Sequence, residues 1–308
     1  MPKILVSDTI AREGIEILRR DYEVVVDDKI TMDALLRVIP DYDALVVRSR
    51  TKVNAAVIDA ATCLRVIGRA GVGVDNIDGD AAARRGIAVV NSPTSAMISV
   101  AEHTLGLMIA LARFIPQADA SLRQGGWEKN KYLGIELSGK TLGIVGLGRI
   151  GSMVAVRAEA FGMRVVVYDP YINSERAQTL GTTLLESLDE LLAISDFVSI
   201  HTPLEPATRG MIGTEKLGKM KPGARLIACA RGGVVDEKAL YAALENGILA
   251  GAALDVFEDE PPGQNPLLNH PRVVVTPHLG AMTEEAQTRA AVDVAEQVVA
   301  ILKKTNPA

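Results

Sequence analysis

The residues of this chain that are best suited to catalysis lie near its end, in the stretch TPHLGAMTEE (276–285). His278 is one of only four histidines, and it follows an apolar segment and precedes Gly280 by two residues. Imidazole exchanges a proton near neutral pH, a carboxylate such as Glu260 fixes its tautomer, and a guanidinium such as Arg231 binds both oxygens of a substrate carboxylate. We therefore expect a proton-transfer centre for a carboxylate-bearing substrate, although each group alone could be a loop cap or a surface charge.

A glycine-rich segment indicates a nucleotide site. GLGRIG supplies Gly146, Gly148 and Gly151 in the spacing G-x-G-x-x-G, after an apolar segment and before a helical one. In that context the glycines allow a tight turn and a close approach of a pyrophosphate to the helix N-terminus. Asp169 ends the next apolar segment, where an acid binds ribose hydroxyls and repels a 2′-phosphate, so NAD is favoured over NADP. The alternative is a glycine-rich turn that binds no ligand.

Polar side chains also follow several later apolar segments, at the edge where parallel sheets bind ligands. They are Thr202, Arg231, Asp255, Glu260 and His278. Their recurrence beside one dinucleotide motif favours a single catalytic site over a set of unrelated loop residues.

Two series of alternating strands and helices must position these groups, and both predict parallel sheets. The first series has expected strands at 3–8, 22–28, 44–49, 64–71 and 87–93. After an apolar helix at 99–113 and a polar stretch at 123–140, the second series starts at 141–151 and continues through expected strands at 164–170, 197–203, 224–232, 251–257 and 272–278. An amphipathic helix is expected at 283–303. The predicted fold is therefore α/β, with two doubly wound parallel-sheet domains of the Rossmann and flavodoxin-like kind.

Composition excludes several other classes of protein. The chain has 308 residues, 48% of them hydrophobic, and a net charge of −5, which gives no reason to expect nucleic acid or a membrane surface as partner. Two cysteines do not make a disulfide framework or a cysteine-rich metal site, so we expect no metal. The first residues lack the pattern of a signal peptide, and a cytoplasmic location is expected.

Long collinear motifs give the chain a resemblance to a known family. They are VVRSRTKV (46–53), GRAGVGVDNID (68–78), GKTLGIVGLGRIG (139–151), ARGGVVDE (230–237), AALDVFEDEPP (252–262) and TPHLGAMTEEAQ (276–287). With them the sequence resembles the D-2-hydroxyacid dehydrogenase family, and most closely its phosphoglycerate dehydrogenase branch. The resemblance implies a discontinuous substrate-binding domain, 1–95 and 281–308, and an NAD-binding Rossmann domain, 96–280. It also implies a cleft between them toward which His278 points.

The resemblance further implies a role for individual residues. His278 would be the acid/base, Glu260 its partner and Arg231 the carboxylate clamp. The cofactor would be bound by Gly146, Gly148, Arg149, Ile150, Gly151, Asp169, Thr202, Cys229, Asp255 and Gly280. The substrate would be bound by Arg48, Val72, Gly73, Arg231 and His278, with Arg48 at a phosphate. Where many relatives carry Asn, this chain has Ala96 and Ala228.

The activity implied is NAD-dependent oxidation of 3-phospho-D-glycerate to 3-phosphohydroxypyruvate, the first step of phosphorylated serine biosynthesis. One alternative is a reductase for glyoxylate, hydroxypyruvate or another D-2-hydroxyacid pair. A more remote one is an NADH-sensing corepressor-like binding protein. A homodimer or a tetramer is expected, because the stretch from Trp127 to Lys131 resembles the arm through which family dimers embrace, with Lys129 reaching a neighbouring site.

Overall fold

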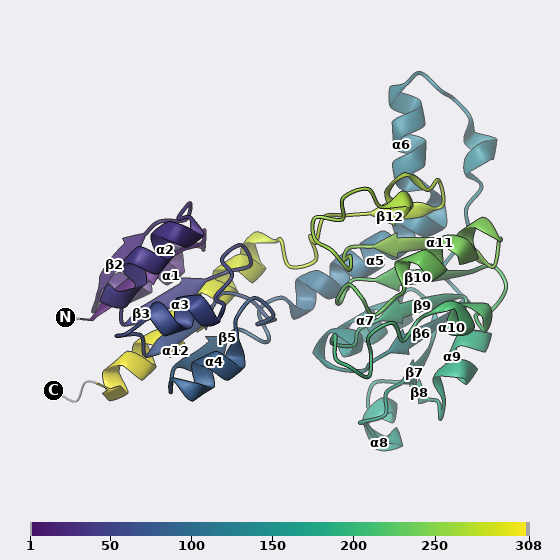
Figure 1. Cartoon of the computed structure of the whole chain (residues 1–308). Coiled ribbons are helices and arrows are strands. Elements are labelled where there is room, and N and C mark those ends of the chain that lie inside the picture. Colours follow the sequence, from purple (N-terminus) through teal and green to yellow (C-terminus); the bar gives the residue numbers. More distant parts are fainter. Residues whose placement is uncertain (1, 306–308) are drawn as a thin grey trace. The chain divides into compact units, whose positions relative to one another are not determined.

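The structure, a computed structural model, describes residues 2–305, and the chain divides into two compact units, 1–96 with 281–308 and 97–280 (Figure 1). Each unit is built on one fully parallel sheet, of five strands in the first and seven in the second. The predicted fold class is therefore confirmed. We call the two parts the five-stranded unit and the seven-stranded unit.

The sheet of the five-stranded unit has the order β2-β1-β3-β4-β5. Its strands are β1 (Lys3–Val6), β2 (Glu23–Val26), β3 (Ala44–Val47), β4 (Val66–Arg69) and β5 (Ala88–Asn91). Its helices are α1 (Arg12–Arg19), α2 (Met32–Val38), α3 (Ala55–Ala60), α4 (Gly79–Arg84) and the last helix α12 (Glu284–Thr305), with the short turn η1 (Ile39–Asp41). The chain order reverses between β1 and β3, which makes their carboxyl ends the switch point of this sheet.

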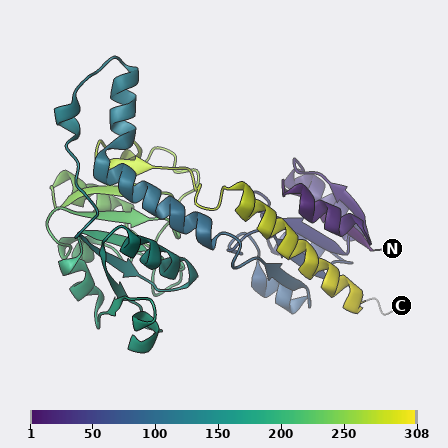
Figure 2. The same ribbon diagram turned by 180° about the vertical axis from the view of Figure 1, so that it is seen from behind.

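Alternation along β1 explains why both faces of this sheet are covered. Ile4 and Val6 are buried in the same apolar cluster as Leu18 of α1 and Val294 of α12. Leu5 is buried on the other face with the residues of α2, α3 and α4. The C-terminal helix α12 lies along the sheet built by the first ninety residues (Figure 2), so the two ends of the chain share one core.

The sheet of the seven-stranded unit has the order β12-β11-β10-β9-β6-β7-β8. Its strands are β6 (Thr141–Val145), β7 (Arg164–Tyr168), β8 (Thr183–Leu184), β9 (Phe197–Ile200), β10 (Ala224–Ala228), β11 (Leu249–Leu254) and β12 (Val273–Val275). Its helices are α5 (Met97–Arg113), α6 (Ile115–Arg123), α7 (Arg149–Ala160), α8 (Ser174–Gln178), α9 (Leu188–Ile194), α10 (Thr214–Gly218) and α11 (Glu237–Glu245), with η2 (Lys129–Tyr132) and η3 (Pro266–Asn269). The switch point lies between β6 and β9, the position at which Rossmann sheets bind dinucleotides.

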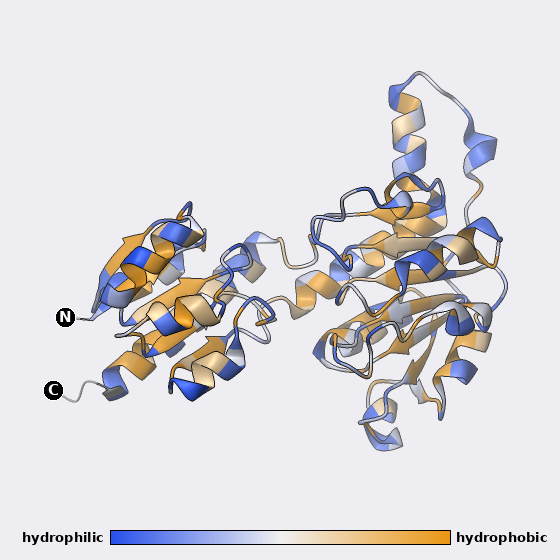
Figure 3. Cartoon of the chain, viewed as in Figure 1, coloured by the Kyte–Doolittle hydropathy of each residue, from blue (hydrophilic) through white to orange (hydrophobic). Residues whose placement is uncertain are grey.

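The strands of both units are apolar almost throughout, as expected of sheets covered on both faces (Figure 3). On the seven-stranded sheet, Val198 and Ile200 of β9 face one large apolar cluster together with Leu226 of β10. Ser199 points to the opposite face and is also buried, so this second face carries polar groups inside the unit.

The apolar helix expected at 99–113 is α5, which begins two residues earlier at Met97. It ends at Arg113; the next residue, Phe114, has a left-handed backbone with φ 54°, and the unpredicted helix α6 follows at once. Among residues 2–305 no single helix is long and apolar enough to cross a membrane, and only α5 and α6 taken together, bent by 62°, pass a test of length and composition. Most of α5 is buried inside its unit.

Candidate active site

The glycine-rich loop after β6 has the geometry that a dinucleotide requires. Gly146 has a positive φ of 94°, and a Cβ there would lie 3.0 Å from the carbonyl oxygen of His201. A Cβ on Gly151 would lie 2.2 Å from the carbonyl oxygen of Gly146, so only glycine lets the helix approach the turn. At Gly148, by contrast, a Cβ would meet no atom within 4 Å. The space beside Gly148 is therefore open to a ligand.

The start of α7 offers the polar half of this site. Gly148 is its N-cap, and no side chain caps the helix, so the first N–H groups, from Arg149 and Ile150 onward, are available to an anion. Asp169 follows β7 and accepts hydrogen bonds from the amides of Leu147, at 2.8 Å, and Tyr171, at 2.9 Å. These bonds fix the carboxylate beside the glycine loop, where a ribose is expected.

The end of β9 adds a polar atom without a protein partner. Among the described residues, the buried hydroxyl of Thr202 makes no hydrogen bond, and its methyl group would lie 3.2 Å from a Cβ on Gly146. A buried hydroxyl is usually satisfied, so one left open beside the glycine loop fits a site that a cofactor completes. The loop, the helix end and Thr202 are together consistent with bound NAD.

Cys229, at the end of β10, is placed differently from the other expected cofactor residues. Its thiol is buried and has a hydrogen-bonding contact with Thr104 of α5, and burial raises the pKa of the thiol to about 12. The side chain is therefore an inert part of the core, and any contact of Cys229 with a cofactor would use its main chain.

His278 and Glu260 are brought together although 18 residues separate them in the chain. Nδ1 of His278 lies 2.8 Å from Oε2 and 3.1 Å from Oε1 of Glu260. The amide of Phe257 also donates to Glu260, at 3.2 Å. Burial alone would raise the pKa of Glu260, but the hydrogen bond from His278 and its charge hold that pKa below the ordinary value. Glu260 is thus an ionised partner that orients the imidazole.

The remaining nitrogen of His278 is uncommitted. Within residues 2–305 Nε2 of His278 makes no hydrogen bond, and 47% of the side chain is exposed. With Nδ1–H directed to a carboxylate, Nε2 is the atom that can exchange a proton with a ligand.

The loop of Arg231 packs against the loop that holds Glu260. A Cβ on Gly232, the next residue, would lie 1.7 Å from the carbonyl oxygen of Phe257 and 2.7 Å from the amide nitrogen of Glu258. Glycine is therefore required where the β10 and β11 loops touch. This contact brings the loops of Arg231, Glu260 and His278 together at the carboxyl edge of the sheet.

Asp255 has a structural use that we did not predict. It is fully buried, and its carboxylate accepts hydrogen bonds from the amides of Leu279, at 2.7 Å, and Gly280, at 2.8 Å. His103 of α5 and Thr276 contact the same carboxylate. Because Leu279 and Gly280 follow His278 directly, Asp255 holds the segment that carries the candidate acid/base.

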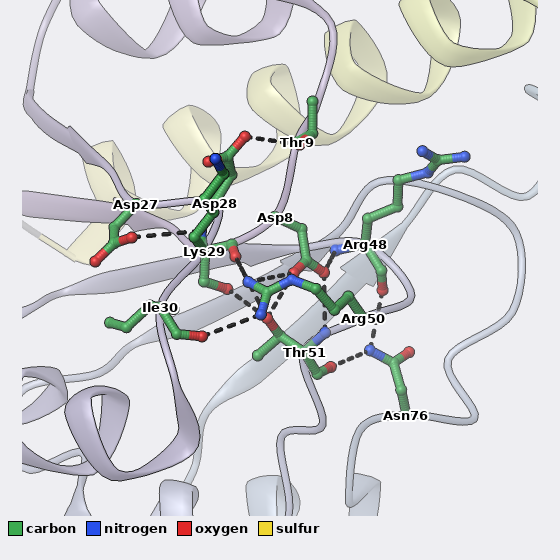
Figure 4. Close-up of polar contacts among 11 residues, drawn as sticks. Asp8, Thr9, Asp27, Asp28, Lys29, Ile30, Arg48, Arg50, Thr51 and Asn76 are labelled. Carbon is green, nitrogen blue, oxygen red and sulfur yellow. Dashed lines mark hydrogen bonds and ion pairs between the residues drawn. The ribbon is translucent and has the colours of Figure 1, made fainter.

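In the five-stranded unit the switch point is organised by Asp8, which follows β1 (Figure 4). Its buried carboxylate accepts from the amides of Arg48 and Thr51 and from the hydroxyl of Thr51. The guanidinium of Arg50 is bound to the carbonyl oxygens of Ser7 and Ile30 and to Asp8. Arg50 is therefore part of the scaffold of this loop.

Arg48 differs from Arg50 although the two are only two residues apart. Its guanidinium extends away from the Asp8 network (Figure 4), and its only side-chain hydrogen bond among the described residues is to the sulfur of Met282. Partial burial lowers the pKa of this guanidinium, which still remains charged at any physiological pH. A partly buried cation without an oxygen partner is suited to bind an anionic ligand.

The expected carboxylate-binding loop follows β4. Asn91, at the end of β5, donates to the carbonyl oxygen of Val72, while the amides of Val72 and Gly73 donate no hydrogen bond within residues 2–305. Arg69, which we did not single out, ends β4 in register with Val47 and directs its guanidinium against Gly71. The sequence could have indicated Arg69 as a candidate, because it is a basic residue at the end of a predicted parallel strand.

Comparison with known proteins agrees with this geometry. The family model for the NAD-binding domain of D-isomer specific 2-hydroxyacid dehydrogenases matches residues 105–280. The chain belongs to this family. The matched residues lie within the seven-stranded unit, which carries the glycine-rich loop.

Individual relatives are similar over nearly all of the chain. The D-3-phosphoglycerate dehydrogenase of Methanocaldococcus jannaschii is 54% identical over 98% of this chain and 58% of its own length. The TT0316 protein of Thermus thermophilus has a TM-score of 0.91 and 39% identity, covering 98% of this chain and 97% of its own. A glyoxylate reductase of Paecilomyes thermophila has a TM-score of 0.89 and 33% identity, covering 99% and 96%. The chain spans about half the length of the curated relatives it matches.

Proposed function

We propose that this D-2-hydroxyacid dehydrogenase oxidises 3-phospho-D-glycerate to 3-phosphohydroxypyruvate. The observation that carries the proposal is the His278–Glu260 pair, which leaves Nε2 of His278 without a hydrogen bond within residues 2–305. The loop of Arg231 packs against the loop that holds Glu260. NAD supplies the hydride acceptor. The substrate hydroxyl gives its proton to Nε2 of His278, and the carbon–oxygen single bond becomes a carbonyl as the hydride leaves. In the reverse direction His278 is the proton donor.

Glu260 and Arg231 prepare the substrate for this proton transfer. Glu260 orients the ring and stabilises the imidazolium that forms when His278 accepts the proton. Arg231 binds the carboxylate and polarises the neighbouring oxygen, because a guanidinium fork can contact both. In the five-stranded unit, which we propose to be the substrate-binding domain, the amides of Val72 and Gly73 donate no hydrogen bond within residues 2–305 and are available to a carboxylate.

Arg48 supports a substrate with a second anion. A 2-hydroxy acid without a phosphate needs cations for one carboxylate only, and Arg231 already serves it. Arg48 is an additional guanidinium with no oxygen partner among the described residues, and Arg69 lies on the adjacent strand end. The curated relative from M. jannaschii is named for the phosphorylated substrate.

A second candidate is reduction of glyoxylate or hydroxypyruvate. It is favoured by the structural likeness to the glyoxylate reductase of P. thermophila. The two functions share the His278 chemistry and differ only in the need for Arg48.

We further propose that the enzyme is a homodimer in the cytoplasm. Trp127 and Leu133 are 82% and 85% exposed, and Ile115 and Leu122 of α6 are also exposed. A row of exposed apolar side chains along α6 and the following loop is more typical of a subunit interface than of a free surface. Both cysteines are free thiols, which suits a reducing compartment.

An NADH-consumption assay with a panel of 2-keto acids tests the proposal. We expect kcat/KM for 3-phosphohydroxypyruvate to exceed that for hydroxypyruvate and glyoxylate by roughly tenfold or more, one charge-assisted contact. A preference for the unphosphorylated acids would support the second candidate. Absence of turnover with every 2-keto acid, together with tight NADH binding, would contradict both.

A further inference from the structure

Three consecutive amides of the segment that carries His278 are bound by one residue, Asp255. The amide of His278 donates to the main-chain carbonyl oxygen of Asp255 at 2.9 Å, and those of Leu279 and Gly280 donate to its carboxylate at 2.7 and 2.8 Å. His278 itself is left-handed, with φ 53°. Non-glycine residues rarely adopt this conformation unless the surroundings impose it. Asp255 is therefore what holds the backbone that aims the imidazole of His278.

His103 is the side chain that fixes this carboxylate from α5. Its Nε2 lies 3.2 Å from Oδ1 of Asp255 and 3.1 Å from the hydroxyl of Thr276, which itself donates to Oδ1 at 2.6 Å. An ionised carboxylate only accepts hydrogen bonds, so His103 must carry its proton on Nε2, and the neutral tautomer suffices. Burial alone would raise the pKa of Asp255, but the hydrogen bonds from His103, Thr276 and the two amides keep it below its ordinary value.

The contacts of His103 and Asp255 lie close to both points at which the chain passes from one unit to the other. His103 follows the first crossing, between Ala96 and Met97, by about two turns of α5, and Gly280 is the last residue before the second crossing. A Cβ on Gly280 would lie 3.1 Å from the Asp255 carboxylate and 3.3 Å from the side chain of Val100. The start of α5 and the end of the His278 segment are thus fastened to each other inside the seven-stranded unit.

We infer that His103 is a positioning residue of this enzyme, which acts through Asp255 to hold His278 in its reactive orientation. The predicted effect on turnover rests on the proposed function, whereas the predicted effect on the orientation of His278 does not. The Nε2–H of His103 is shared between Asp255 and Thr276, so this nitrogen serves the Asp255 carboxylate. Removing His103 leaves a buried carboxylate with one donor fewer, so that Asp255 holds the segment at 278–280 less firmly.

The matched variants are His103→Ala, which removes the N–H, and His103→Gln, whose side-chain amide offers an N–H in a similar place. His270→Gln is the control, because His270 also pairs with a carboxylate, Glu245 at 3.1 Å, in the same unit but at the other end of β12. Two readouts are taken from each full-length variant: kcat and KM with NADH and a 2-keto acid, and histidine-selective NMR. With only four histidines in the chain, the His278 ring signals can be assigned by single substitution.

We expect His103→Ala to lower kcat by roughly 10- to 100-fold, the usual penalty for a misplaced catalytic group, with KM changed by about twofold at most. His103→Gln should recover most of kcat. The His278 ring signals should shift or broaden in His103→Ala and not in His270→Gln, while those of His201 and His270 stay in place in His103→Ala.

The NMR result does not depend on which substrate the enzyme uses, so it separates this inference from the proposed function. His278 signals that remain unchanged in His103→Ala would overturn the inference, whatever the activity. A general change of all histidine signals with a lowered melting temperature would also overturn it, since His103 would then be a residue of the fold alone.

Discussion

Two histidine–carboxylate pairs flank the same strand, β12, and only one of them is built for chemistry. His270 precedes the strand, is 2% exposed, and uses both ring nitrogens: Nε2 meets Glu245 at 3.1 Å and Nδ1 accepts from the amide of Arg272 at 3.1 Å. His278 follows the strand, is 47% exposed, and uses only Nδ1, on Glu260. A histidine beside a carboxylate therefore does not by itself indicate catalysis. A ring nitrogen that makes no hydrogen bond, at the edge of the sheet where ligands bind, does indicate it.

The same distinction separates two arginines of the five-stranded unit. The guanidinium of Arg50 is bound by Asp8 and two carbonyl oxygens, whereas that of Arg48 has no oxygen partner among the described residues. In both units the residue that we propose to contact the substrate, His278 or Arg48, is the one that keeps a hydrogen-bond donor or acceptor without an oxygen partner among the described residues.

The largest effect is expected at His278. Replacing His278 by Gln should lower kcat by about 10²–10⁴-fold, the usual contribution of a positioned acid or base, with little change in the dissociation constant for NADH. The matched change His270→Gln should leave kcat near that of the wild type and lower the free energy of unfolding by about 1–3 kcal/mol, the cost of an unsatisfied buried group. Steady-state kinetics, fluorescence titration with NADH and thermal melting measure all three. Joint loss of NADH binding and activity in His278→Gln would instead indicate a structural role.

The arginine pair should give a smaller effect, and one confined to substrate affinity. Arg48→Ala should raise KM for 3-phosphohydroxypyruvate by roughly 10- to 100-fold, as for loss of a charge-assisted hydrogen bond of about 1.5–3 kcal/mol, and barely change turnover of glyoxylate. Arg50→Ala should lower the melting temperature and, below that temperature, leave KM for both substrates near the wild-type values. If Arg48→Ala impairs the two substrates equally, the phosphate contact is assigned to the wrong residue.

His201 extends the comparison to a histidine without a carboxylate. Its Nε2 contacts Ser199 at 2.8 Å, its Nδ1 is buried without a partner among the described residues, and burial lowers its pKa to about 4. In the unfolded chain the imidazole of His201 keeps its ordinary pKa of 6.5 and therefore binds a proton more readily than in the folded protein. Above pH 6.5 both states are neutral and burying the ring carries no penalty. As the pH falls from 6.5 toward 4, the unfolded state gains the proton and the free energy of unfolding decreases. Denaturant unfolding at pH 7 and pH 5 should show a loss of about 2 kcal/mol that His201→Gln removes. An equal loss in the variant would assign it to other groups.

The smallest effect concerns Asp169, whose two oxygens already accept backbone hydrogen bonds. A carboxylate has further lone pairs, so these bonds leave room for ribose hydroxyls. Asp169→Ser should narrow the preference for NAD over NADP by about tenfold, the value of one hydrogen bond. If the wild-type enzyme prefers NADP, Asp169 serves only to accept the backbone hydrogen bonds of its loop and does not bind the ribose.

The fold class could be predicted from the sequence, because it follows from the alternation of apolar strands and helices. The roles of His278, Glu260, Arg231 and Arg48 came from the family motifs and remain predictions. Strands of Val, Ile and Leu separated by helices predict parallel sheets, and polar residues after such strands lie at one edge. The sequence could not indicate that Cys229 is buried against Thr104, or that Asp255 serves the backbone of the His278 segment. Both depend on α5, which is about 150 residues away from Asp255 and packs on the sheet through long-range contacts.

The left-handed residues Phe114 and His278 were equally beyond prediction. Neither is glycine, and each is held in place by its surroundings rather than by its own preference. The break at Phe114 is followed by a helix, α6, where the sequence suggested no separate element.

A single-turnover experiment on the paired variants tests the central claim most directly. NADH oxidation is followed by stopped flow with enzyme in excess over 3-phosphohydroxypyruvate, in His278→Gln, His270→Gln, Arg48→Ala and Arg50→Ala, below each melting temperature. We predict that the rate of hydride transfer falls at least about a hundredfold in His278→Gln. Because the substrate is the limiting reactant, Arg48→Ala should need a higher enzyme concentration to reach the wild-type rate, whereas His270→Gln and Arg50→Ala should match the wild type. Equal losses in His278→Gln and His270→Gln would contradict the claim.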